Sequence, residues 1–351
     1  MPVEKRSFAR LSAAAPVAPS GASAAQADAA GLGRDVGVIG LGAWQLGADW
    51  GEVSEDAAFA TLGAAVDAGV TFLDTADVYG DGRSEQIIGR FLRQHPAGPS
   101  LTVATKMGRR VPQEPSAYNI DNFRAWNDRS RANLGVDTLD LVQLHCPPTP
   151  VYSTDAVFDA LDTLVQEKRI GAYGVSVERV EEALTAIARP GVASVQIILN
   201  ALRHKPIEAV LPAASAAGVG IIARVPLASG MLSGRYDEHT TFGADDHRNY
   251  NRHGDSFDVG ETFSGVPYEV GLEAVRRLKP LVPPGATMAQ WALRWIADLP
   301  GVTVVIPGAR GPEQARANAA AADLARLTPE AHAAVAEVYD ELIRPLVHDR
   351  W

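Results

Sequence analysis

The sequence predicts an α/β fold: a single (β/α)8 barrel (TIM barrel) with a long loop after the seventh strand and a flexible N-terminal extension. From residue 35 onward, eight short β-prone runs alternate with helical patterns. The runs are apolar almost throughout, which is typical of parallel sheets that helices cover on both faces. Three successive runs end at polar residues, and in a parallel barrel these strand ends open on one face. We expect residues 1–34 to be the extension and 35–351 the barrel domain.

The extension is predicted from composition. Residues 11–30 are almost all Ala, Ser, Pro and Gly and include no aromatic residue. Such a segment cannot bury enough apolar surface to fold alone. A cleaved signal peptide is the alternative reading, but Pro16 and Pro19 and the lack of a Leu-rich apolar segment argue against it.

After the extension the chain alternates between β-prone runs and helical patterns. The β-prone runs are residues 36–41, 70–73, 101–105, 139–144, 170–177, 195–199, 219–225 and 302–306. The helical patterns are residues 54–68, 84–91, 119–134, 154–168, 180–188, 207–217 and 312–322, with a further helix and a tail over 329–351. In the first helix Phe59, Leu62 and Val66 have helical spacing, and Gly69 ends it.

An open dinucleotide-binding sheet is the second choice of fold. Its first turn would carry a G-x-G-x-x-G motif, but Gly40-Leu41-Gly42 lacks the third glycine and Trp44 follows it. A closed barrel therefore explains the eight strands better.

Residues 233–266 form a long polar segment after the seventh strand, on the face where the strands end. Segments of this length without periodicity are usually functional or disordered. The segment contains His239, His247 and His253, but their spacings match no metal-ligand motif, so a solvated loop is the favoured interpretation.

Composition narrows the class of protein. Hydrophobic residues make up 46% and charged residues 21% of the 351 residues, as in ordinary globular proteins. The net charge of −10 argues against nucleic acid and anionic membranes as partners. No apolar run approaches the roughly 20 residues that span a bilayer. The single cysteine, Cys146, excludes an internal disulfide and fits a reducing cytoplasm, and we expect it to be a small buried residue.

Four polar residues at three strand ends suggest chemistry. Asp74 ends the second run, Tyr79 follows it in a Gly- and Asp-rich loop, Lys106 ends the third run and His145 ends the fourth. A lysine ammonium beside a tyrosine lowers the phenol pKa, and an aspartate holds the lysine charged. A histidine nearby can orient a carbonyl oxygen. Taken alone, Asp74 has an equally good structural reading, as a group that only caps a loop or helix.

Further segments of the sequence are typical of one protein family. Besides the residues above, these segments are residues 40–44, 74–80, 84–85, 105–106, 144–145, 174–176, 196, 226–230 and 306–310, with Gln314 and Asn318. These segments lie in one order over residues 36–322, and in this the sequence resembles the aldo-keto reductase superfamily, in its bacterial branch. The resemblance implies an NAD(P)H-dependent oxidoreductase that reduces an aldehyde or ketone to an alcohol, or runs the reverse reaction. It implies Tyr79 as the general acid, Lys106 as its activator, Asp74 as the partner of Lys106 and His145 as the substrate-orienting group.

The resemblance also implies a cofactor site for NADPH, with NADH left open, and no metal. The residues it maps onto that site are Gly42, Ala43, Trp44, Asp74, Ser176, Gln196, Arg224, Pro226, Leu227, Ser229, Gly230, Ser233, Gly234, Arg235, Gly308, Arg310, Gln314 and Asn318. Residues 226–235, with two glycines, two serines and Arg235, fit a loop that wraps a pyrophosphate, and Arg310 is expected at the 2′-phosphate.

The chain departs from the family pattern at several cofactor positions. Val177 stands where Asn is common, and Arg224 stands where an aromatic ring often stacks on the nicotinamide; a planar guanidinium can stack too. Gly308 and Gln314 stand where many members have Lys and Arg.

The substrate pocket is expected at Trp44, Trp50, Tyr79 and His145, with Tyr118 and Trp126 as further aromatic candidates or core residues. The partner would be a small carbonyl or alcohol; a homo-oligomer stays open. Two other classes remain: a non-catalytic nucleotide-binding regulatory partner like the family's channel β-subunits, and a barrel lyase or isomerase without nicotinamide.

Overall fold

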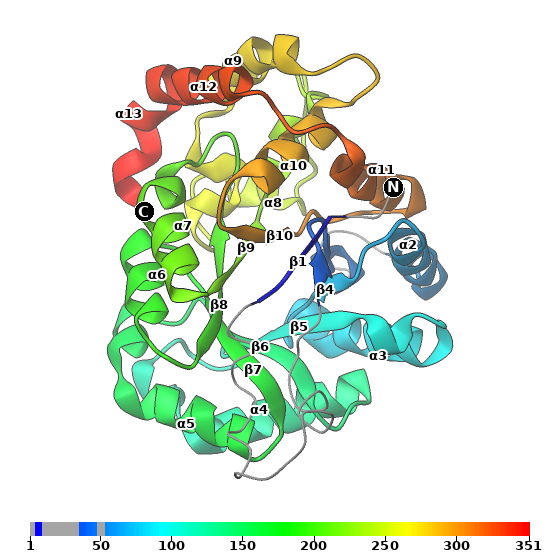
Figure 1. Cartoon of the computed structure of the whole chain (residues 1–351), viewed down its shortest axis with the longest axis vertical. Helices are drawn as coiled ribbons and strands as arrows, with labels where there is room; N and C mark the ends of the chain where they lie inside the picture. The colour runs from blue at the N-terminus through cyan, green and yellow to red at the C-terminus, as the bar shows by residue number, and fades with distance from the viewer. Residues whose placement is uncertain (1–3, 9–34, 48–52) are drawn as a thin grey trace.

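The computed structural model describes residues 4–8, 35–47 and 53–351. Eight strands form one sheet in the order β10-β9-β8-β7-β6-β5-β4-β3, with every pairing parallel. They are β3 (Leu41–Gly42), β4 (Phe72–Asp74), β5 (Thr102–Met107), β6 (Leu139–His145), β7 (Ile170–Ser176), β8 (Val192–Ile198), β9 (Gly220–Arg224) and β10 (Val302–Val305). Parallel bridges from Ile39 to Val305 and from Gly42 to Gly308 join the two edges. The predicted (β/α)8 barrel is confirmed (Figure 1).

Helices surround the ring of strands (Figure 1). They are α2 (Glu55–Asp67), α3 (Arg83–Gln94), α4 (Ile120–Leu134), α5 (Asp155–Gln166), α6 (Val180–Ile187), α7 (Lys205–Ala217), α9 (Tyr268–Leu278), α10 (Met288–Asp298), α11 (Pro312–Ala319), α12 (Pro329–Val338) and α13 (Arg344–Val347). The bounds follow from the expected caps. The Ser54 side chain accepts from the Ala57 N–H at the start of α2, and Gly135 ends α4 at φ 69°. α9 and α10 have no counterpart among the helices predicted from sequence.

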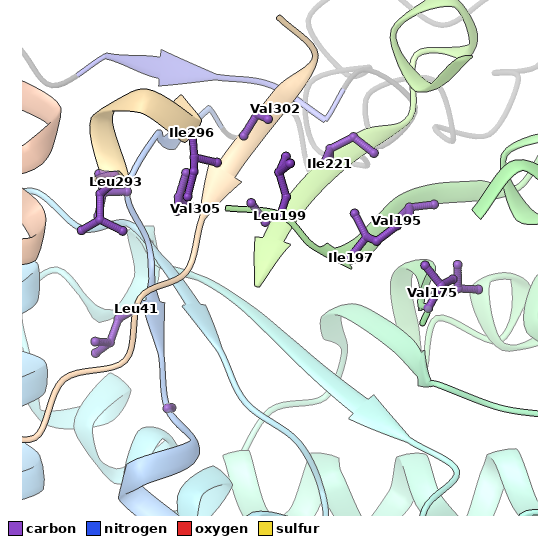
Figure 2. Close-up of a cluster of buried hydrophobic side chains, with 14 of the residues drawn as sticks. Leu41, Val175, Val195, Ile197, Leu199, Ile221, Leu293, Ile296, Val302 and Val305 are labelled. Atoms are coloured by element: carbon purple, nitrogen blue, oxygen red, sulfur yellow. The ribbon is translucent and has the colours of Figure 1, made fainter. Parts of the chain in front are cut away.

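Two apolar layers hold the barrel together. The outer one lies between strands and helices; in Figure 2, Leu293 and Ile296 of α10 belong to the same buried cluster as Val302 and Val305 of β10. The inner one fills the barrel and is made of Phe8, Val36, Phe72, Ala104, Leu141, Ala172, Ala193, Ile222, Val304 and Ile306. The interior is therefore a packed core, as in other barrels of this type.

The N-terminal prediction is wrong for residues 4–8. Strand β1 (Lys5–Arg6) pairs antiparallel with β2 (Val36–Gly37), and in Figure 1 it lies across the ring of strands. Phe8 is 1% exposed and its ring stacks on Phe72 at 5.8 Å, so it plugs the barrel. Consequently the predicted first strand, 36–41, is divided between this hairpin and β3. Residues 9–34 lie outside the described residues, between β1 and β2 in sequence.

The long segment after β9 is structured where loop was expected. It contains the short helix α8 (His247–Tyr250) and two 3₁₀ turns, Val259–Glu261 and Phe263–Gly265. The Asn251 carboxamide oxygen accepts from the amides of Ser256 and Phe257, which folds the segment back on itself. Beyond α12, the predicted tail consists of a π-helical turn (Tyr339–Ile343), α13 and a 3₁₀ turn (His348–Arg350).

Candidate active site

Asp74, Tyr79, Lys106 and His145 meet at the C-terminal ends of β4, β5 and β6. Asp74 and His145 are the last residues of their strands, and Lys106 lies one residue before the end of β5. Tyr79 opens the 3₁₀ turn Tyr79–Gly82 that follows β4. The parallel register therefore brings together residues that are widely separated in sequence, as the strand-end pattern predicts.

The Lys106 ammonium connects the acid to the phenol. Lys106 Nζ donates to Asp74 Oδ1 at 2.5 Å, to the Thr75 carbonyl at 2.9 Å and to the Tyr79 hydroxyl at 3.3 Å. The other oxygen of Asp74 accepts from Gln196 Nε2 at 2.8 Å and from Gln143 Nε2 at 3.3 Å. A buried ion pair is tolerated when its remaining hydrogen-bonding capacity is satisfied in this way.

The pKa of Tyr79 differs from the expectation. Burial raises the pKa of the Tyr79 phenol above its usual value, while the positive charge of Lys106 acts in the opposite direction and only limits the rise. Burial alone would lower the pKa of Lys106, but the Asp74 charge and the Tyr79 phenol outweigh it and raise it. At neutral pH the site thus holds a neutral phenol beside a charged ammonium.

His145 is held neutral. Burial, and then the positive charges of Arg109, Lys106 and Arg224, lower the pKa of His145 well below its usual value. Its ring lies edge-on to the Tyr79 ring at 6.0 Å, and its Nδ1 has no hydrogen-bond partner among the described residues. A neutral imidazole next to the phenol can orient a carbonyl oxygen without adding charge.

The backbone around Tyr79 is in a strained turn. Gly80, Asp81 and Gly82 all have positive φ (57°, 52° and 93°), and a Cβ on Gly80 would lie 2.1 Å from the Gly47 carbonyl oxygen. The guanidinium groups of Arg110 and Arg129 donate to the Asp81 carboxylate and thereby fix this turn. Left-handed stretches of this kind persist only where surrounding contacts determine them.

Asp77, two residues before Tyr79, is an unusual buried acid. It is fully buried, and neither carboxyl oxygen has a hydrogen-bond partner within the described residues. Burial, and then the negative charge of Glu85, raise the pKa of Asp77 to about 7. An aspartate in a loop is normally solvated, so the sequence alone does not indicate this burial.

We expect Asp77→Asn to stabilise the protein in a pH-dependent way. An acid whose folded pKa is raised costs no stability below about pH 4, where both states are protonated, and the cost is complete above about pH 7. The variant should gain about 2–4 kcal/mol at pH 8 and close to nothing at pH 4, measured by urea unfolding. The exposed Asp159→Asn serves as the matched control. An equal change for Asp77→Asn at both pH values would contradict this interpretation.

A cavity of about 1470 Å³ opens beside these groups. Asp74, Tyr79 and His145 line it, whereas Lys106 lies behind them, 1% exposed. Of the predicted cofactor residues, Gly234 is not on its wall; the others all are, namely Gly42, Ala43, Trp44, Asp74, Ser176, Gln196, Arg224, Pro226, Leu227, Ser229, Gly230, Ser233, Arg235, Gly308, Arg310, Gln314 and Asn318.

The Gly/Ser loop after β9 makes a tight left-handed turn at the cavity wall. Ala228, Ser229 and Gly230 have φ values of 47°, 55° and 90°. The Ala228 amide donates to the Val225 carbonyl at 3.0 Å and the Gly230 amide to the Leu227 carbonyl at 2.9 Å, so these two amides hold the turn itself. The Ser229 hydroxyl is already engaged, because it donates to the Glu261 carbonyl at 2.7 Å and accepts from the Phe263 amide at 3.2 Å. Tyr236 also contacts this loop, because its hydroxyl donates to the Ser229 carbonyl at 3.3 Å.

Arg224 is bound differently from the stacking role expected of it. Its guanidinium donates to the Glu261 and Glu178 carboxylates and to the Val177 carbonyl. These contacts fix its plane and pair its charge, although it still lines the cavity. The sequence could not reveal this clamp because Glu178 and Glu261 come from two other loops.

The segment 308–318 is held by hydrogen bonds between its own residues. Gln314 Oε1 accepts from the Arg310 amide at 2.9 Å, and Asn318 Nδ2 donates to the Gly308 carbonyl at 3.0 Å. The Arg310 side chain is exposed on the cavity wall.

The predicted substrate pocket is partly revised. Trp44 lines the cavity and stacks on Tyr79 at 5.9 Å, whereas Tyr118 and Trp126 are buried in the core. Trp50 lies outside the described residues. Cys146 was expected to be buried but is partly exposed on the cavity wall, and burial of its thiol raises its pKa to about 12.

The long segment after β9 contributes cavity-wall residues that are absent from the predicted site. His247 and Phe257 lie 6.2 Å and 6.1 Å from the Trp44 ring, and Tyr236, Arg248 and Glu261 also line the cavity. Its aromatic and charged residues had no periodicity, so only its position after β9 indicated a role.

A sequence model of the Aldo/keto reductase family matches residues 38–340. The chain belongs to this family. An aldo-keto reductase of Bacillus subtilis, YhdN, is 30% identical over 293 residues, which cover 82% of this chain and 86% of the relative. The protein is therefore an aldo/keto reductase-type oxidoreductase.

Solved structures of other aldo/keto reductases have the same fold. The glycerol dehydrogenase AKR11B4 of Gluconobacter oxydans superposes with a TM-score of 0.73 at 29% identity, covering 90% of this chain and 93% of that one. An aldo/keto reductase of Klebsiella pneumoniae, in complex with NADP and acetate, superposes with a TM-score of 0.63 at 25% identity, covering 88% and 93%. In the described part of this aldo/keto reductase, no helix has the length and apolar character to cross a membrane.

Proposed function

We propose that this aldo/keto reductase reduces an aldehyde or ketone to an alcohol with NADPH, and that Tyr79 donates the proton. The observation that carries the proposal is the Lys106 ammonium, 3.3 Å from the Tyr79 hydroxyl and ion-paired with Asp74, at the wall of a large cavity. A phenol in this setting can give up a proton to a substrate oxygen while its conjugate base is stabilised.

The residues on the cavity wall fit a nicotinamide dinucleotide. Ser176 and Gln196 offer polar groups at the reactive end, beside Asp74. The loop at residues 226–235 lies along the cavity wall and would hold the pyrophosphate, with Arg235 as the nearby cation. Arg310, exposed on the wall, would pair with a 2′-phosphate, which favours NADPH over NADH. The Klebsiella pneumoniae relative, in complex with NADP, supports this choice.

The chemistry divides between cofactor and protein. When bound, NADPH supplies the hydride that reaches the carbonyl carbon. His145 donates an N–H to the carbonyl oxygen and so aligns the substrate beside Tyr79. The Tyr79 hydroxyl gives its proton to that oxygen, which completes the alcohol, and Lys106 stabilises the phenolate that remains. Asp74 keeps Lys106 charged and directed at Tyr79. Oxidation of an alcohol uses the same groups in reverse.

The site fits a carbonyl compound of modest size. Trp44 and Phe257 form an aromatic wall next to Tyr79, and Arg109, Glu178 and Glu261 add hydrogen-bonding groups on the cavity wall. This combination accepts substrates that have an apolar part and a polar part.

The proposal is tested by NADPH consumption with 4-nitrobenzaldehyde and a panel of small carbonyl compounds, repeated with NADH. We expect turnover, with NADPH preferred. Arg310→Ala should raise the KM for NADPH about tenfold, because a hydrogen bond to a charged group contributes about 1.5 kcal/mol. NADH, which lacks the 2′-phosphate, is the internal control and should be unaffected. NADPH binding without turnover of any carbonyl would instead favour a regulatory nucleotide-binding role.

A further inference from the structure

A strained turn carries Glu261 to the cavity. Residues 258–265 contain two consecutive non-glycine residues with positive φ, Phe263 at 51° and Ser264 at 58°, followed by Gly265 at 72°. Each such conformation costs free energy and requires contacts that hold it in place. One of these contacts comes from Asn200, whose Nδ2 donates to Ser264 Oγ at 2.8 Å.

The second contact that holds the turn comes from Trp351, which follows α13. Its indole Nε1 donates to both carboxylate oxygens of Asp258, each at 3.1 Å. Asp258 Oδ1 also accepts from the Gly260 amide at 2.7 Å, so one carboxylate links the indole to the turn. Trp351 is 5% exposed even though it follows the last helical turn.

The turn and its surroundings are shaped to receive this ring. A Cβ on Gly265 would lie 2.4 Å from the indole, and one on Gly260 would lie 3.0 Å from it. The guanidinium of Arg203, a residue that is 2% exposed, lies over the indole at 3.5 Å from the ring centroid. A desolvated cation over a tryptophan face is a favourable contact. The indole therefore lies between a buried cation and two glycines of the turn.

The opposite side of the same turn contacts the active-site cavity in two places. The Glu261 carboxylate pairs with Arg224 on the cavity wall. The Glu261 carbonyl and the Phe263 amide hold the Ser229 hydroxyl, within the left-handed stretch at 228–230. Movement of the turn would therefore disturb both the substrate end of the cavity and the loop that we propose to hold the pyrophosphate.

We propose that Trp351 is a positioning residue of the active site, which acts through Asp258 and the 258–265 turn on Arg224 and on the loop at 228–230. This inference rests on the proposed function for its kinetic part. Trp351 does not line the cavity, and other elements carry the four groups: Asp74, Tyr79, Lys106 and His145 lie on or directly after β4, β5 and β6. Loss of the indole should therefore weaken binding and leave the chemical step intact.

The experiment compares Trp351→Ala, Trp351→Phe and Tyr339→Phe with the wild type in the full chain. Tyr339→Phe is the matched control, since it removes a hydroxyl that bonds His348 Nδ1 at 2.9 Å and so alters the same C-terminal segment without removing the indole. We expect Trp351→Ala to raise the carbonyl KM and the NADPH Kd about five- to twentyfold, with kcat unchanged. Trp351→Phe, which retains a ring over Arg203 but no N–H donor, should lie between Trp351→Ala and wild type.

Hydrogen exchange in the nucleotide-free protein gives a readout that needs no activity. Amides of residues 258–265 should exchange faster in Trp351→Ala than in wild type, while amides of β4–β6 should be unchanged. If wild type turns over no carbonyl, the proposed function fails, but the exchange result still tests whether Trp351 holds the 258–265 turn. Unchanged KM, Kd and exchange in a folded Trp351→Ala would overturn the inference; if that variant does not fold, Trp351→Phe gives the same three readouts.

Discussion

Tyr79→Phe is expected to lower kcat for carbonyl reduction by about 100-fold or more, because general acid catalysis typically contributes 10²–10⁴-fold. The substitution removes one oxygen atom. It leaves the ring that stacks on Trp44 at 5.9 Å and the backbone of the strained turn in place. NADPH binding, measured by quenching of protein fluorescence, should be close to that of wild type.

Tyr118→Phe is the matched control for this variant. Tyr118 is also a buried tyrosine, 3% exposed, but its hydroxyl bonds Gln113 Oε1 at 3.1 Å and does not line the cavity. It should retain activity near the wild-type level. A Tyr79→Phe variant with wild-type kcat would mean that the proton comes from another group.

Lys106→Met should destabilise the protein by about 3–5 kcal/mol, the usual cost of removing one partner from a buried ion pair. The cost arises because the buried Asp74 carboxyl, 3% exposed, would lose its ion-pair partner and retain hydrogen bonds from the side-chain amides of Gln143 and Gln196. Urea unfolding at pH 7 measures the change in the free energy of unfolding.

The double variant Asp74→Asn/Lys106→Met separates stability from chemistry. Asparagine retains an oxygen that can accept from Gln196, and no uncompensated charge remains, so most of the lost stability should return. Activity should stay low, because the phenolate of Tyr79 has lost its stabilising charge. A double variant as unstable as Lys106→Met would show that the cost does not come from the buried charge.

The barrel could be predicted because its signal is local. Each strand is a short apolar run and each helix has its own apolar spacing and caps, as at Ser54 and Gly135. β1 and its pairing with β2 could not be predicted in this way. Lys5–Arg6 carries no apolar pattern, and its partner strand lies beyond residues 9–34, so only the three-dimensional structure reveals the pairing.

The same contrast between local signals and long-range contacts applies to the candidate site. Asp74, Tyr79, Lys106 and His145 were predictable because strand ends converge in a parallel barrel. The clamp on Arg224 by Glu178 and Glu261 depends on long-range contacts between loops, so no local pattern indicates it. Likewise, the raised pKa values of Tyr79 and Asp77 depend on burial, which sequence spacing does not report.

The pairing of β1 with β2 has a consequence for how the chain tolerates change. The pairing brings together the two ends of the connection between β1 and β2, and buried Phe8 anchors the first of these ends. The entropy lost on closing a flexible loop grows only with the logarithm of its length, about 0.6 kcal/mol for each doubling. The hairpin lies at the end of the barrel opposite the cavity, since Phe8 packs on Phe72 at the start of β4 and Asp74 ends that strand. Chain length can therefore vary between β1 and β2 at little thermodynamic cost and without disturbing the groups that surround Tyr79.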